Sequence, residues 1–431
     1  MAKLAINGGK PVREELFPAY NTITAAEKQA ALEVMDTGNM SQFLGCWHPD
    51  FFGGPKVQEF ESRWGSAFGA KHVISVNSNT SGLFAAIGAA GVGPGDEVIV
   101  SPYTMSASAI APVVYGAVPV FADIQDDIFT LDPKSIEEKI TPRTKAILVV
   151  HIFGHPADMD PIMELAKKHN LVVIEDCAQA PLATYKDRMV GTIGDMGVFS
   201  LNYHKHIHTG EGGMVTTNSD HFAERLQLIR NHGEVSVLPK GVEDLKNMWG
   251  FNYRLTEIQA AIGITQLERA DGYIQARIEN CEYLAGKLSV LPGLVLPVTY
   301  PDCRHVYYAH ALKYRQDETG IPRDLFVDAV AAELPSAVLR ESTGKLIGAG
   351  YVEPLYMQPI YQQRAGTSCS FNCPRYEGHA DYQKGLCPVA ERMHYEELFT
   401  HEYMRPPMNQ RDLDDVVRAF EKVVENLGEL R

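Results

Sequence analysis

The alternation of short β-branched runs with helix-like segments over residues 72–218 most constrains the fold. Seven such runs are His72–Val76, Glu97–Val100, Val118–Phe121, Ala146–Val150, Leu171–Ile174, Gly197–Ser200 and Met214–Thr217. Strands that alternate with helices form mostly parallel sheets, because each crossover lays its helix on a face of the sheet. The pattern therefore predicts an α/β fold with a mostly parallel sheet flanked by helices.

The clearest crossover lies between a strand at 145–151 and a strand at 171–175. Asp160 followed by Pro161 predicts the start of the intervening helix, since aspartate caps free amides and proline fits the first turn. These residues are therefore interpreted as one βαβ unit.

The chain of 431 residues is long enough to bury two cores. A long helix is expected over 256–288, where apolar residues recur at helical spacing, and Leu291–Gly293 ends that pattern. We assign residues 1–290 to a large domain with an N-terminal segment. Residues 291–431 are assigned to a smaller C-terminal α+β domain, in which 343–390 is expected to form irregular loops.

Charge and composition exclude several classes of function. The formal net charge is -15, without a local basic patch, which disfavours nucleic acids and anionic membranes as partners. No stretch approaches the roughly twenty apolar residues that span a bilayer, and the start lacks a signal-peptide core, so we expect a cytoplasmic protein. The seven cysteines lack CxxC spacing, and Cys369, Cys373 and Cys387 are too loosely spaced to predict a metal site.

Polar residues at the ends of strands are the first candidates for a site, because ligands of open α/β sheets bind beyond the carboxyl ends of the strands. The run that ends in Glu175 and Asp176 places a carboxylate at a buried strand end, where it needs a partner. A protonated pyridine nitrogen would serve, and the carboxylate would keep that ring protonated. A helix cap or a salt bridge is the alternative.

Two further strand ends add a phosphate site and an amine. The turn at Asn79 and Thr80 opens a helix of small residues, whose free amides suit a phosphate, although simple capping is the alternative. Ser200 ends a strand five residues before Lys205. A lysine with a lowered pKa attacks carbonyls, although most single lysines are merely exposed. Pyridoxal 5'-phosphate (PLP) would give all three strand ends a partner.

Four motifs resemble the DegT/DnrJ/EryC1/StrS sugar aminotransferases. They are Asp176–Gln179, Phe199–Ser200 with Lys205, Thr209–Gly213, and Gly250–Arg254 with Gln259–Ala261. The resemblance covers nearly the whole chain. It implies a PLP-dependent fold of type I, like aspartate aminotransferase, and a homodimer with active sites at the subunit interface.

The resemblance also implies roles for individual residues. Lys205 corresponds to the lysine that forms the Schiff base, and Asp176 to the partner of the pyridine nitrogen. The other cofactor-binding residues implied are Gln179 beside the ring hydroxyl, Ser200 and the Asn79 and Thr80 amides at the phosphate, and Asn252 reaching the phosphate from the neighbouring subunit. Met105 departs from the family, which usually has an aromatic residue stacked on the ring there; a thioether can contact an aromatic face less rigidly.

The histidines around Lys205 allow two other interpretations. His204, His206 and His208 alternate as metal ligands on a strand would, but no acidic ligand accompanies them, so no metal is expected. Some family members are dehydratases with histidine in place of the lysine. Here Lys205 occupies that position, five residues after Ser200, and His204 and His206 do not, which favours transamination.

The resemblance implies glutamate or glutamine as the amino donor. As acceptor we expect an 8-keto-3,8-dideoxy-octulosonate of the Kdo type, as in lipopolysaccharide biosynthesis, with a keto-cyclitol second and a nucleotide-linked keto-hexose third. Candidate acceptor-binding residues are His155, Arg254, His305, Tyr307 and Tyr308, each equally open to a structural role, and Arg230 or Arg254 could bind a carboxylate. A non-catalytic regulatory protein and a metal-dependent hydrolase remain alternatives.

Overall fold

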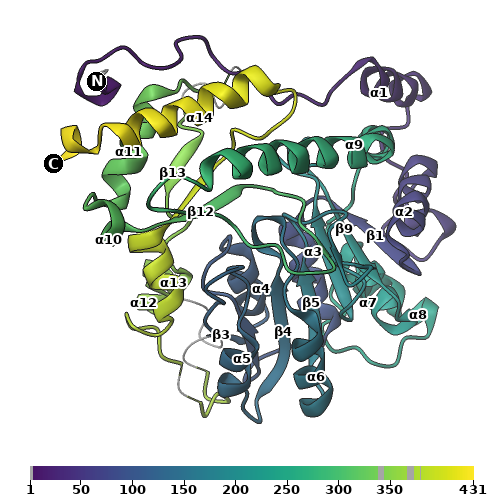
Figure 1. Cartoon of the computed structure of the whole chain (residues 1–431). Helices are drawn as coiled ribbons and strands as arrows, with labels where there is room; N and C mark the ends of the chain where they lie inside the picture. The colour runs from purple at the N-terminus through teal and green to yellow at the C-terminus, as the bar shows by residue number, and fades with distance from the viewer. Residues whose placement is uncertain (1–2, 338–343, 366–372, 379) are drawn as a thin grey trace.

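The computed structural model describes residues 3–337, 344–365, 373–378 and 380–431 (Figure 1). Its main sheet has seven strands in the order β1-β9-β8-β5-β4-β2-β3. Their bounds are β1 His72–Val76, β2 Glu97–Val100, β3 Val118–Phe121, β4 Thr144–Val150, β5 Val172–Asp176, β8 Met196–Ser200 and β9 Gly213–Thr217. Strands β8, β5, β4, β2 and β3 are parallel, and β9 runs antiparallel to both of its neighbours. The prediction of a mostly parallel sheet is confirmed.

Helices cover both faces of this sheet. They are α3 Asn79–Ala89, α4 Ala107–Val114, α5 Pro133–Lys139, α6 Met159–His169, α7 Asp220–Arg230 and α8 Gly233–Lys240. Two glycines let α3 approach the sheet closely. A Cβ on Gly82 would lie 2.6 Å from Val198 Cγ1, and one on Gly213 would lie 2.8 Å from Asn79 N. Larger side chains there would push the start of α3 away from the ends of β8 and β9.

The start of α6 differs from the sequence prediction. The helix begins at Met159 after Asp158, and Asp160 lies within its first turn. The Asp160 carboxylate forms ion pairs with Lys186 and Arg188 at 2.6 and 2.7 Å instead of capping the helix. A local capping rule does not foresee these partners, because they come from the hairpin of β6 (Thr184–Tyr185) and β7 (Arg188–Met189).

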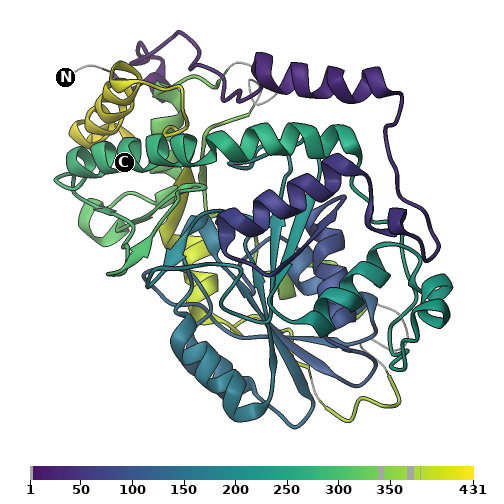
Figure 2. The ribbon, with the colours of Figure 1, turned by 90° about the vertical axis from the view of Figure 1, so that its right-hand side faces the viewer.

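The long helix α9, Glu257–Leu288, confirms the predicted helix. Thr256 and Gln259 form a capping box at its start, which satisfies free amides of the first turn. Figure 2 shows α1 (Ala25–Thr37) and α2 (Pro55–Phe68) beside α9, and both helices contact it. The N-terminal part of the chain therefore packs on the helix that crosses above the sheet.

A second sheet has the order β10-β12-β14-β13. The elements of this region are β10 Leu294–Val295, β12 His310–Tyr314, β13 Ile347–Ala349, β14 Leu398–His401, α10 Gln316–Thr319, α11 Arg323–Glu333, α12 Pro359–Gln362, α13 Pro388–Arg392 and α14 Gln410–Glu425; β11, Cys303–Arg304, pairs with β6. The described residues of segment 343–390, which was expected to be irregular, thus include the short elements β13 and α12 and the start of α13. Leu4 and Phe17 join the apolar core of this region, and the division at 290 stays a prediction.

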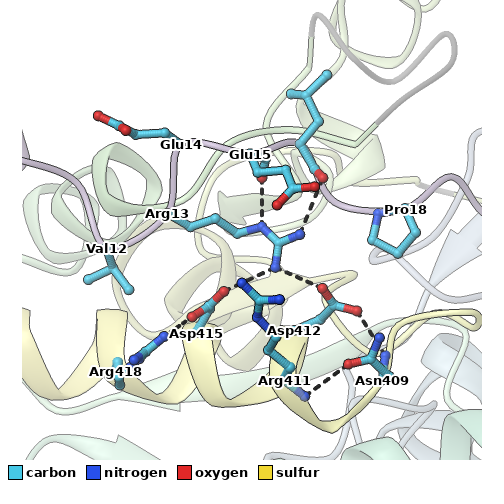
Figure 3. Close-up of a pocket in the computed structure, with 11 residues that line it drawn as sticks. Val12, Arg13, Glu14, Glu15, Pro18, Asn409, Arg411, Asp412, Asp415 and Arg418 are labelled. Atoms are coloured by element: carbon cyan, nitrogen blue, oxygen red, sulfur yellow. Dashed lines mark hydrogen bonds and ion pairs between the residues drawn. The ribbon is translucent and has the colours of Figure 1, made fainter.

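The N-terminal segment is also fixed to α14 by charge. Arg13 Nη1 contacts Asp412 Oδ1 at 2.7 Å and Asp415 Oδ2 at 3.0 Å, inside a cavity of about 650 Å³ (Figure 3). All three side chains are nearly buried, so removal of one partner would leave a charge with little solvent. Among the described residues, no helix is long and apolar enough to cross a membrane.

Candidate active site

A cavity of about 220 Å³ lies where β5 and β8 end and α3 begins. It gathers seven of the eight residues expected from the sequence, namely Asn79, Thr80, Met105, Asp176, Gln179, Ser200 and Lys205. The two strands are parallel neighbours, so their terminal residues Asp176 and Ser200 face the same edge of the sheet. Parallel strand order therefore explains why motifs far apart in the sequence meet here.

The start of α3 forms an anion site on one side of the cavity. Ser78 caps the helix by accepting from Ser81 N at 3.0 Å, and Gly82 N is the first amide that donates within the helix, to Ser78 O. The amides of Asn79 and Thr80 precede it and have no acceptor in the helix. Together with the helix dipole, they suit a phosphate.

Asp176 is a buried carboxylate with ordered partners. Its Oδ2 accepts from Ser108 Oγ at 2.8 Å, and its Oδ1 accepts from Asn79 Nδ2 at 3.3 Å and from Ala178 N at 3.1 Å. Burial raises the pKa of this carboxyl, although these hydrogen bonds and the charge of Lys205 oppose the shift. A cationic ligand beside Asp176 would therefore stabilise its charged form.

Lys205 is also buried, with 9% of its surface exposed. Its Nζ lies 4.2 Å from the centroid of the Tyr308 ring. Burial lowers the pKa of Lys205 to about 8; the charge of Asp176 acts against this shift, and that of Arg405 adds to it. The amine is therefore neutral in a large share of molecules near pH 8, as a nucleophile or base requires.

Gln179 is held between two groups. Its Oε1 accepts from Phe153 N at 2.7 Å, and its Nε2 donates to Tyr351 OH at 2.8 Å. These bonds fix the amide in one orientation at the wall of the cavity.

Comparison with known proteins shows which protein family contains this chain and its cavity. A family model described as the DegT/DnrJ/EryC1/StrS aminotransferase family matches residues 47–421. The chain belongs to this family. It is therefore a PLP-dependent aminotransferase, which decides against the regulatory protein and the metal-dependent hydrolase.

Three similar proteins illustrate the relationship. An L-glutamine:2-deoxy-scyllo-inosose aminotransferase from Micromonospora echinospora is 34% identical and covers all of both chains. A GDP-perosamine synthase from Caulobacter vibrioides is 41% identical over 67% of this chain and 74% of its own length. The crystal structure of an aminotransferase from Psychrobacter cryohalolentis has 30% identity and a TM-score of 0.78, covering 96% of this chain and all of that one. The similarity confirms the predicted type I fold.

The residues of the aminotransferase fit PLP. Free amides lie at one end of the cavity, a buried carboxylate that a cationic partner would keep charged lies at the strand end, and a buried amine faces the same space. A phosphate, a ring nitrogen and an aldehyde carbon each find a group of matching chemistry there.

Two further expected cofactor residues line the cavity but differ in exposure. Ser200 is nearly buried in the cavity, where its Oγ accepts from Asn202 N at 3.3 Å. Met105 lines the rim with 61% of its surface exposed in the single chain. Whether Met105 stacks on the cofactor ring stays a prediction.

Asn252 is the expected residue that lies outside this cavity. It is exposed, and its Oδ1 accepts from Arg254 Nε at 2.6 Å. Arg230, considered as a carboxylate-binding residue, is instead buried, and its guanidinium contacts Glu61 at 2.7 Å. That interpretation of Arg230 is wrong, because its charge is already compensated inside the fold.

Most candidate acceptor residues have structural contacts. His155 Nε2 accepts from Tyr300 N at 3.1 Å, and His305 Nε2 lies 3.1 Å from Phe153 O. Tyr307 stacks on the His305 ring, with centroids 3.8 Å apart. Of this group, Tyr308 lines the cavity.

The histidines beside Lys205 are partnered by other parts of the protein. His206 Nε2 lies 2.9 Å from Val306 O, and His208 Nε2 lies 2.8 Å from Thr22 Oγ1. His204 lines the cavity itself. The imidazoles of His206 and His208 therefore contact two different parts of the fold.

The described residues include one cluster with potential metal ligands, His151, Glu175 and Cys177. His151 Nδ1 accepts from Ala157 N at 2.9 Å, so its Nε2–H donates to Glu175 at 3.0 Å. Glu175 also accepts three backbone amides from residues 191–194. The cluster is thus satisfied by hydrogen bonds. Cys369 lies outside the described residues.

Sequence reasoning missed several residues of the site. Ser108 at the start of α4 donates to Asp176, and Tyr351 accepts from Gln179. Asn202 and Glu211 line the cavity and share a 2.8 Å hydrogen bond. For Ser108, the signal was its place three residues after Met105, and for Tyr351 it was only its place in the segment 343–390.

Proposed function

We propose that the enzyme transfers an amino group from glutamine or glutamate to a small keto-cyclitol. The observation that carries this proposal is the buried pair of Lys205 and Asp176 in a cavity of about 220 Å³. This pair supports the transfer of an amino group, and the choice of a cyclitol as acceptor rests on the relatives. The relative that aminates 2-deoxy-scyllo-inosose aligns over the whole chain, which supports the same choice.

Each site residue has one task in this proposal. Bound PLP supplies an electron sink for the bonds around the amino carbon. Lys205 would hold the cofactor at its aldehyde carbon until the amino group of the donor replaces it there, and the freed Lys205 amine would then move the proton to and from the substrate carbon as general base and acid. Asp176 keeps its charge beside the pyridine nitrogen, the amides of Asn79 and Thr80 hold the phosphate with Ser200, and Gln179 lies beside the ring.

The proposed enzyme is a cytoplasmic homodimer. Val235, Leu238, Leu245 and Trp249 expose 51 to 88% of their surfaces on α8 and the segment after it. Clustered exposed apolar side chains of this kind favour a protein interface. Asn252 follows this patch in the sequence and lies outside its own cavity, which suits contact with the phosphate of a neighbouring subunit.

The pH dependence of cofactor attachment tests the state of Lys205. Since burial lowers the pKa of Lys205 to about 8, the neutral amine predominates above that pH. We expect the rate of covalent PLP uptake by the cofactor-free enzyme to rise with pH, with its midpoint near 8. The uptake rate is measured from the absorbance of the cofactor between pH 6 and 11. The rate of the reaction of PLP with free lysine, measured under the same conditions, corrects for the pH dependence of PLP itself. A midpoint near 10 contradicts the account.

A panel of acceptors tests the proposed substrate. The enzyme is first reacted with glutamine and freed of the keto acid, and the return of the cofactor's original absorbance is followed as each acceptor is added. We expect 2-deoxy-scyllo-inosose to restore it. Restoration by a nucleotide-linked keto-hexose alone would contradict the proposal. Restoration by the 8-keto octulosonate alone would contradict it too and favour the Kdo-type acceptor, with its role in lipopolysaccharide biosynthesis.

A further inference from the structure

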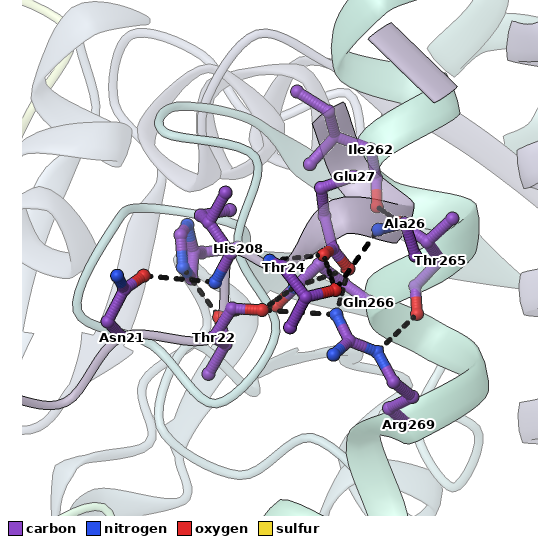
Figure 4. A network of polar contacts seen from close by, with 11 residues as sticks. Asn21, Thr22, Thr24, Ala26, Glu27, His208, Ile262, Thr265, Gln266 and Arg269 are labelled. Atoms are coloured by element: carbon purple, nitrogen blue, oxygen red, sulfur yellow. Dashed lines mark hydrogen bonds and ion pairs between the residues drawn. The ribbon is translucent and has the colours of Figure 1, made fainter. Parts of the chain in front are cut away.

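The N-terminal segment reaches the loop that carries Lys205. Tyr20 OH donates to His206 O at 3.4 Å, and Thr22 Oγ1 lies 2.8 Å from His208 Nε2. His206 and His208 follow Lys205 by one and three residues. Two side chains near the start of the molecule therefore contact the loop that carries Lys205. Figure 4 shows the contact between Thr22 and His208.

The directions of the hydrogen bonds around Thr22 are fixed. Thr22 Oγ1 donates to Gln266 Oε1 at 2.9 Å, so the same oxygen accepts from His208 Nε2–H. Gln266 Nε2 donates to Thr22 O at 3.1 Å and to Glu27 Oε1 at 3.0 Å. Gln266 is fully buried on α9, so its amide makes its hydrogen bonds inside the protein. The imidazole, hydroxyl and amide thus form one ordered chain.

The Glu27 carboxylate lies at the end of this series of hydrogen bonds and fixes the direction in which they donate. Glu27 also accepts from Thr24 N and Oγ1, each at 2.8 Å, and pairs with Arg269. Burial alone would raise the pKa of Glu27, but hydrogen bonds from Thr24 and Gln266 lower it to about 2. The charged carboxylate therefore holds the Gln266 amide with its NH₂ toward α1 and its oxygen toward Thr22.

The lysine loop, residues 201–209, has backbone hydrogen bonds near each end, and side-chain contacts to other segments hold the residues between them. Within the loop, Lys205 N donates to Asn202 O and Thr209 N donates to Leu201 O, both at 2.9 Å. Between these two bonds, the side chains of His206 and His208 connect the loop to Val306 O and Thr22. The backbone directly after Lys205 is thus held from two different parts of the chain.

We propose that Thr22 is a positioning residue for Lys205. Its hydrogen bond to His208 fixes the loop that follows Lys205 and so keeps the Lys205 side chain in place beside Asp176. The inference rests on the proposed role of Lys205 in the reaction. Thr22 itself lines no part of the cavity. It acts by ordering the loop, so substrate binding should be nearly independent of it while proton transfer by Lys205 is not.

Thr22→Val tests this proposal, because valine keeps the shape and removes both hydrogen bonds. We expect hydrogen exchange of the 203–209 backbone amides in the holoenzyme to become about tenfold faster, and kcat to fall about tenfold with KM changed less than about twofold. Thr22→Ser retains the hydroxyl and should restore both values. Thr265→Val is the matched control, since the Thr265 hydroxyl donates to Ile262 O on the same helix.

Unchanged exchange of 203–209 and unchanged kcat in a folded Thr22→Val enzyme would overturn the proposal. If that variant does not fold, His208→Leu removes the same contact from the loop side, with the same expected effects and the same contradicting outcome. The exchange rate reports on the loop whatever Lys205 does. A failure here therefore differs from failure of the proposed function, which would appear as transamination without Lys205.

Discussion

Lys205→Ala is expected to lower the rate of amino transfer from glutamine by at least about 10³-fold. The variant loses the amine that holds the cofactor and moves the proton, and general acid–base catalysis alone contributes about 10²–10⁴. Single-turnover absorbance of the PLP-loaded enzyme after addition of glutamine measures the rate. The cavity should still bind PLP non-covalently, because the α3 amides and Asp176 remain.

Lys168→Ala is the matched control for this loss. Lys168 lies on the exposed side of α6 and pairs with Glu137, at 2.9 Å. The control should transaminate at the normal rate. A Lys205→Ala enzyme that retains more than about a tenth of the normal rate would show that another base moves the proton.

Asp176→Asn is expected to lower the same rate by about 10²–10³, the usual effect of removing one preorganised electrostatic partner. The amide oxygen can still accept from Asn79 and Ala178, and its NH₂ can donate to Ser108, whose hydroxyl reverses. The fold should therefore persist while the negative charge beside the pyridine nitrogen is lost. Single turnovers with glutamine, together with the free energy of unfolding, separate these effects.

Asp195→Asn provides the control, because Asp195 precedes β8 and lies beside the start of β5, at the opposite end of that strand from Asp176. Asp195 is a carboxylate that accepts from Val173 N at 2.8 Å, away from the cavity. This variant should keep its catalytic rate, with at most a loss of stability. A similar loss of rate in both variants would attribute the effect to the sheet and not to the charge at Asp176.

The main sheet and most of the site could be predicted because their signals are local. Buried parallel strands appear as apolar runs, and polar residues directly after them mark the carboxyl edge, as at Asp176 and Ser200. The start of α3 could be found in the same way from Asn79 and Thr80. Lys205 became recognisable from its spacing to Ser200 and the family motifs around it.

The contacts that could not be predicted are those between distant segments. Ser108 and Tyr351 meet Asp176 and Gln179 across 68 and 172 positions of the chain. Arg230 looked available as a single arginine, but its partner Glu61 comes from α2. The link from Thr22 to His208 spans 186 positions, and no periodicity or motif encodes such a pairing.

The central claim is that Lys205 carries the cofactor, and its most direct test is chemical. Borohydride reduction of the PLP-loaded enzyme fixes the cofactor to the amine that holds it, and mass spectrometry of the digested protein identifies the labelled lysine. The account predicts the reduced pyridoxyl mass on the peptide containing Lys205, and its absence from that peptide in Lys205→Ala. A label on another lysine, or equal labelling of the variant, would contradict it.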